Sequence, residues 1–114
     1  MNCSKTNAFR VADSVALRKR NTAWLSYQEE LLEGVSVEDI FWKIVWQIKV
    51  LSIVKKGYGS GLHPFVFKKA QKASPLFKEE ELDGRFADLV DLYHKNRQGK
   101  SDLLIGLEKF ILRI

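Results

Sequence analysis

The sequence has little cysteine for disulfides, little proline or glycine to interrupt helices, and no long apolar run to span a membrane. Cys3 is the only cysteine among 114 residues, which excludes an internal disulfide and a multi-cysteine zinc site. Two prolines and seven glycines leave little room for a many-turned β-sandwich. No apolar run approaches the roughly 18 residues that span a bilayer, and residues 1–5 lack the hydrophobic core of a secretory signal. We therefore expect a cytoplasmic domain with no membrane segment.

Reactive side chains are also scarce. His63 and His94 are the only histidines, and neither has a second ligand at metal-binding spacing. The carboxylates of 79–81 are consecutive, so on a helix they point in different directions and favour a helix start over a catalytic cluster. Cys3 lies in the terminus expected to be frayed, without a basic pocket that would activate a thiol. The sequence therefore predicts no catalytic residue, no metal site and no cofactor.

The charge is positive and unevenly distributed. The net charge is +5, and residues 1–76 hold 12 basic against 6 acidic side chains. Basic residues gain affinity for nucleic acid by releasing condensed counterions. Here they are spread over 18–20, 55–56 and 68–69, which is typical of solvated helix surfaces. A small basic helical nucleic-acid-binding protein nevertheless stays open as the alternative function.

Hydrophobic periodicity predicts two helices in the first third of the chain. The first follows Asn7 as its N-cap and is closed by the basic residues of 18–21. The second runs from about Thr22 to Glu33, and Gly34 is suited to a left-handed C-terminal cap. The apolar side chains expected on the two inner faces are Phe9, Ala12, Val15 and Ala16, then Trp24, Leu25, Leu31 and Leu32, with Gln28 on the second stripe.

The third predicted helix has the clearest start signal and two apolar sides. Ser36 and Asp39 have the spacing of a capping box, and the helix continues to about Lys55. One side carries Ile40, Phe41, Ile44, Ile48 and Leu51, and the second carries Trp42, Trp46, Val50 and Ile53. A helix that is apolar on two sides must be covered twice. We therefore expect it to be central, with the second side a candidate partner contact.

Three more helices are predicted after a glycine-rich connection at 56–61. His63 and Pro64 open the fourth, which ends near 74–75; the fifth begins near Lys78, and Ser101 or Asp102 caps the sixth. Their expected apolar faces are Phe65, Val66, Phe67 and Ala70; Leu82, Phe86, Leu89, Val90 and Tyr93; and Leu104, Leu107, Ile111 and Ile114. The predicted fold is all-α, a single five- to six-helix bundle over 7–114 behind a frayed terminus at 1–6.

Six short motifs occur in order along the chain. They are Asn7-Ala8-Phe9 with Ala12-Asp13, Glu30 to Gly34, Trp46-Gln47-Ile48-Lys49-Val50-Leu51, Leu62-His63-Pro64-Phe65 with Lys68-Lys69-Ala70, Glu80-Glu81-Leu82 with 91–95, and Leu107-Glu108. In this order they resemble the C-terminal helical domain of the bacterial DNA polymerase III delta subunit, which is a component of the clamp loader. Three features depart from the family pattern: Lys49 stands where arginine is common, Lys78 replaces a serine or threonine cap, and the turn at 96–100 is slightly longer.

The resemblance implies a collar-like domain that acts in DNA replication by assembly and catalyses nothing. Its partners would be clamp-loader subunits of the delta-prime and tau/gamma types, with self-association or a weak DNA contact also possible outcomes. The family's clamp-binding residues lie in an ATPase-like portion outside the resemblance. The expected interface is Trp42, Trp46, Val50 and Ile53, and the signature residues with structural roles are Gln47, Lys49, His63, Pro64, Phe65, Lys68, Lys69, Leu82 and Glu108.

Overall fold

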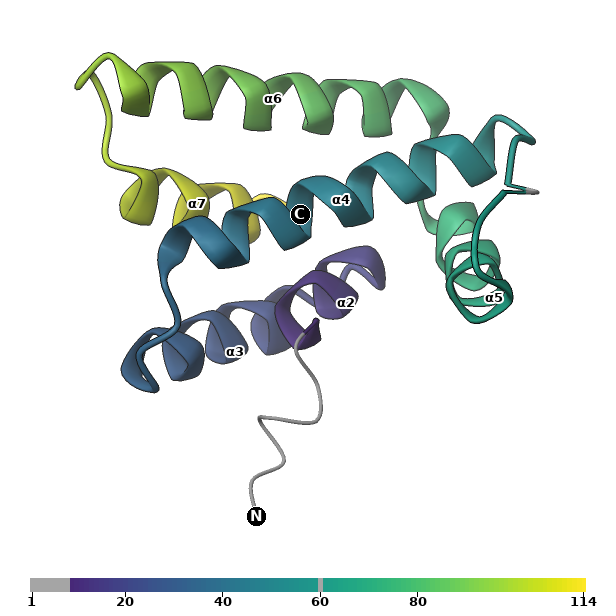
Figure 1. Cartoon of the computed structure of the whole chain (residues 1–114), viewed down its shortest axis with the longest axis horizontal. Helices are drawn as coiled ribbons and strands as arrows, with labels where there is room; N and C mark the ends of the chain where they lie inside the picture. Colours follow the sequence, from purple (N-terminus) through teal and green to yellow (C-terminus); the bar gives the residue numbers. More distant parts are fainter. Residues whose placement is uncertain (1–8, 60) are drawn as a thin grey trace.

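The chain folds into an all-helical bundle, seen in a computed structural model that describes residues 9–59 and 61–114 (Figure 1). The elements are α2 (Arg10–Ala16), α3 (Arg20–Leu32), α4 (Val37–Lys55), α5 (Pro64–Ala73), the 3-10 turn η1 (Ser74–Leu76), α6 (Glu79–Arg97) and α7 (Leu103–Leu112). No strand occurs within these ranges, which confirms the predicted fold class. None of the described helices is long and apolar enough to cross a membrane. The predictions for Cys3, the Asn7 cap and the terminus at 1–6 lie outside the described residues.

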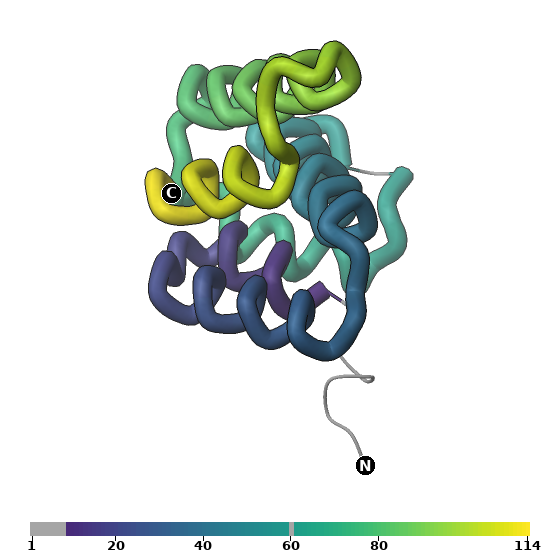
Figure 2. Tube along the Cα trace, turned by 90° about the vertical axis from the view of Figure 1, so that its left-hand side faces the viewer, coloured from purple at the N-terminus to yellow at the C-terminus, as the bar shows by residue number. Residues whose placement is uncertain are grey.

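Helix α4 is the centre of the bundle, as its two apolar sides predicted. It runs through the middle of the molecule, with α6 on one side and the α2–α3 pair on the other (Figure 1). It also contacts α5 and α7, and the tube view shows α7 lying between α6 and the α2–α3 pair (Figure 2). Five of its side chains are at most 1% exposed: Ile40, Phe41, Ile44, Ile48 and Leu51.

The predicted starts of the last four helices are confirmed by their hydrogen bonds. Ser36 Oγ accepts from the main-chain N–H three residues later at 3.2 Å. His63 Nδ1 and Asp102 Oδ1 each accept from the N–H two residues later at 3.1 Å. At α6 the cap residue is Lys78, whose side chain cannot accept, but Glu81 reaches back and accepts from its N–H at 3.2 Å. These bonds use main-chain donors that have no partner within the helix.

The boundary between the first two helices differs from the prediction. Helix α2 ends at Ala16 rather than in the basic run, and α3 begins at Arg20 rather than Thr22. Arg18 lies in the left-handed region with φ of 56°, and the N–H of Lys19 bonds the carbonyl of Ser14 at 2.9 Å. This reversal completes the turn within a few residues. Arg20 therefore belongs to the next helix.

The buried face of α3 also differs from the prediction. Leu25 is 55% exposed and Leu32 is 89% exposed, although both were expected inside. Ala23, Ser26, Tyr27 and Glu30 are the buried residues of α3, and the predicted Trp24 and Leu31 pack against the core partly buried. Small side chains let α2 pack closely, while the Tyr27 hydroxyl and the Glu30 carboxylate have polar partners inside the fold. The buried side of α3 is therefore determined by its long-range partners and not by the positions of its leucines.

Smaller corrections apply to the last three helices. Phe65 and Leu104 are 64% and 40% exposed, although both were expected inside, and Leu103 is buried instead. Helix α7 is apolar almost all round, so its period alone could not select the inner side. In α6, Phe86 and Val90 lie just outside the core that Leu82 and Leu89 join.

Candidate docking surface

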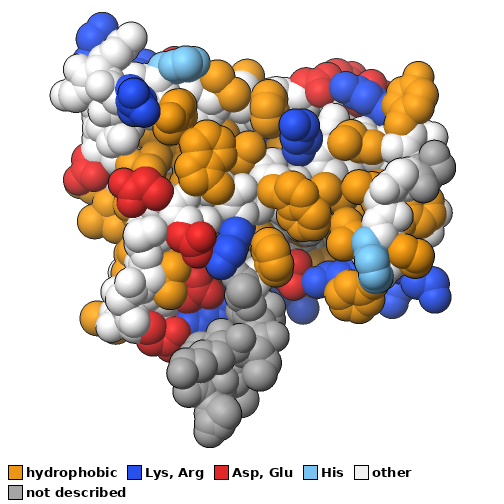
Figure 3. Space-filling view, in the orientation of Figure 1, with side chains coloured by type: hydrophobic (Ala, Val, Ile, Leu, Met, Phe, Trp, Pro, Cys, Tyr) orange, Lys and Arg blue, Asp and Glu red, His pale blue; other side chains and the backbone are white. Residues whose placement is uncertain are grey.

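Large apolar side chains are exposed along α4 and the helices beside it. Trp42 is 50% exposed, Trp46 41%, Phe9 40% and Phe65 64%. We call these four residues the aromatic face. The space-filling view shows hydrophobic side chains distributed across this whole side of the molecule, over α4 and at its borders with α5 and α6 (Figure 3). Large exposed apolar side chains gathered on one side of a molecule are typical of interaction sites.

Neighbouring rings hold the two α4 tryptophans in place. The ring centroid of Trp42 lies 5.1 Å from that of Tyr93 and 5.0 Å from that of Phe41, both in edge-on geometry. The centroid of Trp46 lies 5.6 Å from that of Phe9. Such aromatic pairs stabilise a fixed arrangement. A partner that binds these rings therefore pays little additional ordering entropy.

A groove separates α2 from α5, with α4 forming its floor. It consists of two hollows of about 150 and 200 Å³. Asp13, Gln47 and Lys69 line both hollows, and an ion pair of 2.7 Å between Lys69 Nζ and Asp13 Oδ2 joins α5 to α2 across the groove. The first hollow is completed by Phe9, Trp46, Val50, Phe65, Val66 and Ala70, and the second by Ala16, Leu17, Lys72 and Ala73. We call this the α2–α5 groove.

The four predicted interface residues are divided among different places. Trp42 and Trp46 present exposed ring edges. Val50 is only 3% exposed and lines the α2–α5 groove, so most of its surface is already covered by this chain. Ile53 is half-buried in a separate hollow of about 280 Å³ between α4 and α6, beside the exposed ring of Phe86.

Part of the predicted signature gathers at the α2–α5 groove. Gln47 is 6% exposed on its floor, and Phe65 and Lys69 line its α5 side. Lys68 is exposed on α5, and Lys49 on the outer side of α4. Three of these five residues therefore meet at one site despite their separation in sequence.

The remaining signature residues support the fold elsewhere. His63 caps α5, and Pro64 is its first residue. Leu82 is fully buried in the core. Glu108 Oε2 accepts a hydrogen bond from Trp24 Nε1 at 2.9 Å, which ties α7 to α3. These four positions are structural in this geometry.

Some groove residues were not identified from sequence. Phe9 was expected inside but is 40% exposed. Asp13 belongs to the first sequence motif but was not predicted as a site residue. Asp13 and Lys69 are 56 positions apart, so their ion pair leaves no periodic signal. Phe65 and Lys69 do share the i, i+4 spacing of one helix face, which is the available clue.

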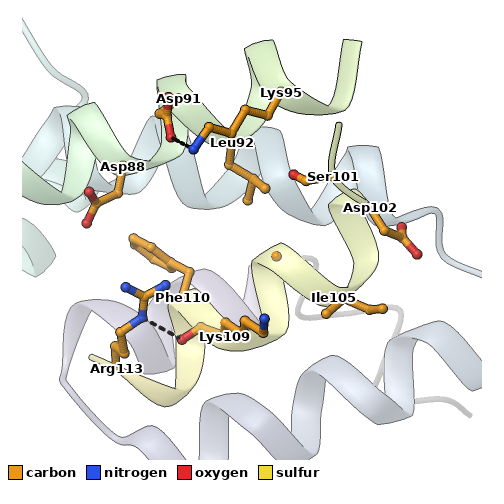
Figure 4. Close-up of a pocket in the computed structure, with 11 residues that line it drawn as sticks. Asp88, Asp91, Leu92, Lys95, Ser101, Asp102, Ile105, Lys109, Phe110 and Arg113 are labelled. Carbon is orange, nitrogen blue, oxygen red and sulfur yellow. Dashed lines mark hydrogen bonds and ion pairs between the residues drawn. The ribbon is translucent and has the colours of Figure 1, made fainter. Parts of the chain in front are cut away.

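A larger, more polar cleft lies between α6 and α7 (Figure 4). Its volume is about 520 Å³, and charged side chains line both rims. Lys95 Nζ pairs with Asp91 Oδ2 at 3.0 Å on its own helix. Gly106 leaves room for Leu92, because a Cβ there would lie 2.2 Å from Leu92 Cδ1. Nothing in this arrangement resembles a nucleophile paired with a base.

The described residues also lack metal and catalytic constellations. They contain no group of three or more His, Cys, Asp or Glu side chains able to hold a metal ion. Within 9–59 and 61–114, neither His63 nor His94 forms an ion pair with a carboxylate. The exposed rings and the apolar hollows described above suit binding.

Comparisons with known proteins agree on one relationship. Residues 5–114 match the family model described as DNA polymerase III delta subunit, C-terminal domain. DNA polymerase III subunit delta of Bacillus subtilis (strain 168) is 26% identical over 121 residues, covering 95% of this chain and 34% of that protein. The chain therefore spans about a third of the length of this curated relative. No solved structure gives a significant match.

Proposed function

Because the chain belongs to the family formed by the C-terminal domains of DNA polymerase III delta subunits, we propose that it is a non-catalytic assembly domain within a clamp loader. In this role it acts in bacterial DNA replication in the cytoplasm. Its partners are other clamp-loader subunits, of the delta-prime and tau/gamma types, whose helical domains pack beside it. The aromatic face is the observation that supports this proposal.

The composition of the aromatic face suits a protein partner. Aromatic side chains are enriched at protein interfaces, and tryptophan is frequent among the residues that dominate binding energy. Trp42 and Trp46 supply two such rings on one helix, already positioned by neighbouring rings. Ile53 lies apart from them, in the separate hollow between α4 and α6.

The experiment is to mix the purified domain with the delta-prime and tau/gamma-type subunits of the same organism and measure association by calorimetry. The double variant Trp42→Ala/Trp46→Ala should weaken binding at least tenfold, since a tryptophan at an interface centre contributes about 2 kcal/mol or more. Leu32→Ala is the matched control, because Leu32 is 89% exposed on α3, outside the aromatic face. If none of these subunits binds the wild-type domain, the proposed function is wrong.

The alternative of nucleic-acid binding has less support from the charges. Each of the predicted basic runs contains a residue that is paired inside the domain: Arg18 with Glu81 at 2.8 Å, Lys56 with Asp83 at 3.3 Å, and Lys69 with Asp13 at 2.7 Å. These pairings reduce the charge available to phosphates. Affinity for DNA measured across salt concentration tests the alternative, because phosphate contacts give a steep negative dependence.

A further inference from the structure

We propose that the α2–α5 groove binds an acidic amphipathic helix of a partner protein in the clamp loader. This inference rests on the proposed function and specifies the partner's chemistry at one part of the surface. It is carried by three features of the groove: a side-chain amide on the floor that is open to an occupant, two apolar hollows and a positively charged α5 rim.

The floor carries a polar side chain that has no partner in the described chain. Gln47 is 6% exposed and lines both hollows. Its side-chain amide atoms are not sealed from solvent, and they form none of the side-chain hydrogen bonds found among the described residues. Because the amide is open to the groove, water can satisfy it in the free domain, and an occupant of the groove would replace those hydrogen bonds. The groove therefore presents both a donor and an acceptor to whatever occupies it.

The two hollows suit apolar side chains projecting from a helix. Each is lined mainly by apolar atoms, and each is of the size of one large side chain. The Lys69–Asp13 pair lies between them and separates the two sockets. An amphipathic helix laid into a groove between two helices places successive anchors in this way, at i, i+3 or i+4 and i+7.

The charges on the rim select an acidic helix. Lys69 and Lys72 line the groove, and Lys68 is exposed beside Lys69 on α5 without lining either hollow. Neither Lys68 nor Lys72 forms an ion pair with a described carboxylate. Asp13 is the one acidic lining residue, and Lys69 neutralises it. Complementary charge selects partners and orients them. A second copy of this domain would bring the same lysines together, so the occupant is a different, acidic chain.

The test uses two synthetic peptides that differ only in charge. Both have leucines at i, i+3, i+4 and i+7 over three helical turns; the other positions are glutamate in one and lysine in the other. Fluorescence anisotropy at low salt should show the glutamate peptide binding the domain about tenfold more tightly than the lysine peptide. Amide chemical shifts should move in α2, α4 and α5. Equal binding of the two peptides, or shifts confined to other helices, would overturn the proposal.

Variants identify the groups responsible. Lys68→Glu/Lys72→Glu should reverse the peptide preference, while Lys100→Glu/Lys109→Glu makes the same charge change outside the groove and should leave it unchanged. Phe65→Ala removes an exposed ring that lines the first hollow. Gln47→Met keeps the size of the side chain but removes its amide. Each should weaken binding about fivefold. An unchanged affinity in Phe65→Ala and Gln47→Met together contradicts the groove assignment.

Peptide binding tests the groove assignment, and association with clamp-loader subunits tests the proposed function, so the two can fail independently. If clamp-loader subunits bind the domain with equal affinity after Lys68→Glu/Lys72→Glu, the groove assignment fails while the assembly function stands. If the glutamate peptide binds in the groove but none of the clamp-loader subunits associates, the assembly function fails while the groove chemistry stands.

Discussion

The Nε of Arg10 donates a 2.9 Å hydrogen bond to Oε2 of Glu30, joining α2 to α3 from within the fold. The carboxylate side chain is only 7% exposed, so this guanidinium is its principal compensation for lost hydration. Two more carboxylates, Glu29 at 3.4 Å and Glu33 at 3.1 Å, surround the other guanidinium nitrogens. One arginine thus fixes the contact between these two helices.

Replacing Arg10 by methionine should lower the free energy of unfolding by about 2–3 kcal/mol, because it leaves the Glu30 carboxylate buried without a counter-charge. Urea denaturation at pH 7 measures this. The double variant Arg10→Met/Glu30→Met should recover most of the loss. Lys95→Met is the control, since it removes only an exposed pair with Asp91 and should change stability by less than about 0.5 kcal/mol. A small loss in Arg10→Met would contradict the role given to this pair.

Two glycine-to-alanine substitutions should change the free energy of unfolding in opposite directions. Gly34 follows α3 with φ of 93°, where a side chain strains the backbone, so Gly34→Ala should destabilise the domain by about 1 kcal/mol. Gly84 lies inside α6 with no atom within 4 Å of the added Cβ, so Gly84→Ala should stabilise it by about 0.5–1 kcal/mol. Thermal unfolding measures the melting temperature of each variant relative to wild type. A shift in the same direction for both variants would refute the assigned conformations.

The sequence was sufficient for the starts of α4 and α5 because caps are local. Ser36 and His63 act on main-chain groups two or three residues away, so their signals are contained in a short window. It was also sufficient for the central helix, whose inner face runs from Ile40 to Leu51 at regular spacing.

The buried side of α3 and the α2–α5 groove could not be predicted, because both depend on residues that are distant in the sequence. Tyr27 is buried rather than Leu25 because its hydroxyl finds a carbonyl on α7, 77 residues away. The α2–α5 groove arises similarly, from an ion pair between Asp13 and Lys69. The sequence singled out Gln47 and Lys69 through motifs, but only the fold shows that both line one groove.

Glu81 should titrate below the ordinary range of a glutamate. The 2.8 Å contact with the Arg18 guanidinium lowers the pKa of its carboxyl, and the main-chain N–H of Lys78 adds to the effect. A pKa that is lower in the folded state contributes stability above the unfolded pKa, and this is lost as pH falls through the folded value. Carbon-13 NMR of the carboxyl should show the low pKa in the wild type and its rise in Arg18→Met.

The same pair makes part of the stability pH-dependent. The free-energy difference between wild type and Arg18→Met should shrink as pH falls from 7 to about 3. A constant remainder should persist, because Arg18 also donates to the Leu76 carbonyl at 2.9 Å and lies 4.7 Å from the Phe77 ring centroid. A difference that does not vary with pH would show that Glu81 carries none of the effect.

Tyr27 should make the domain sensitive to alkali. Its hydroxyl donates to the Leu104 carbonyl at 2.7 Å, and burial, aided by the carboxylates of Glu108 and Asp102, raises the pKa of the phenol. A raised folded pKa contributes stability that is fully present below the unfolded value, near pH 10, and is lost as pH rises toward the folded value.

Tyr27→Phe should therefore cost about 1 kcal/mol at pH 7 by removing the hydrogen bond to α7. Above about pH 10 the gap to wild type should narrow and then change sign, since phenylalanine has no proton to lose while the wild-type phenol resists ionising in the fold. Tyr58→Phe is the control, because Tyr58 is 76% exposed and should follow the wild type at every pH. Denaturant unfolding between pH 7 and 11 gives the comparison, and parallel curves for Tyr27→Phe and wild type would show that burial of this phenol does not govern the alkaline loss.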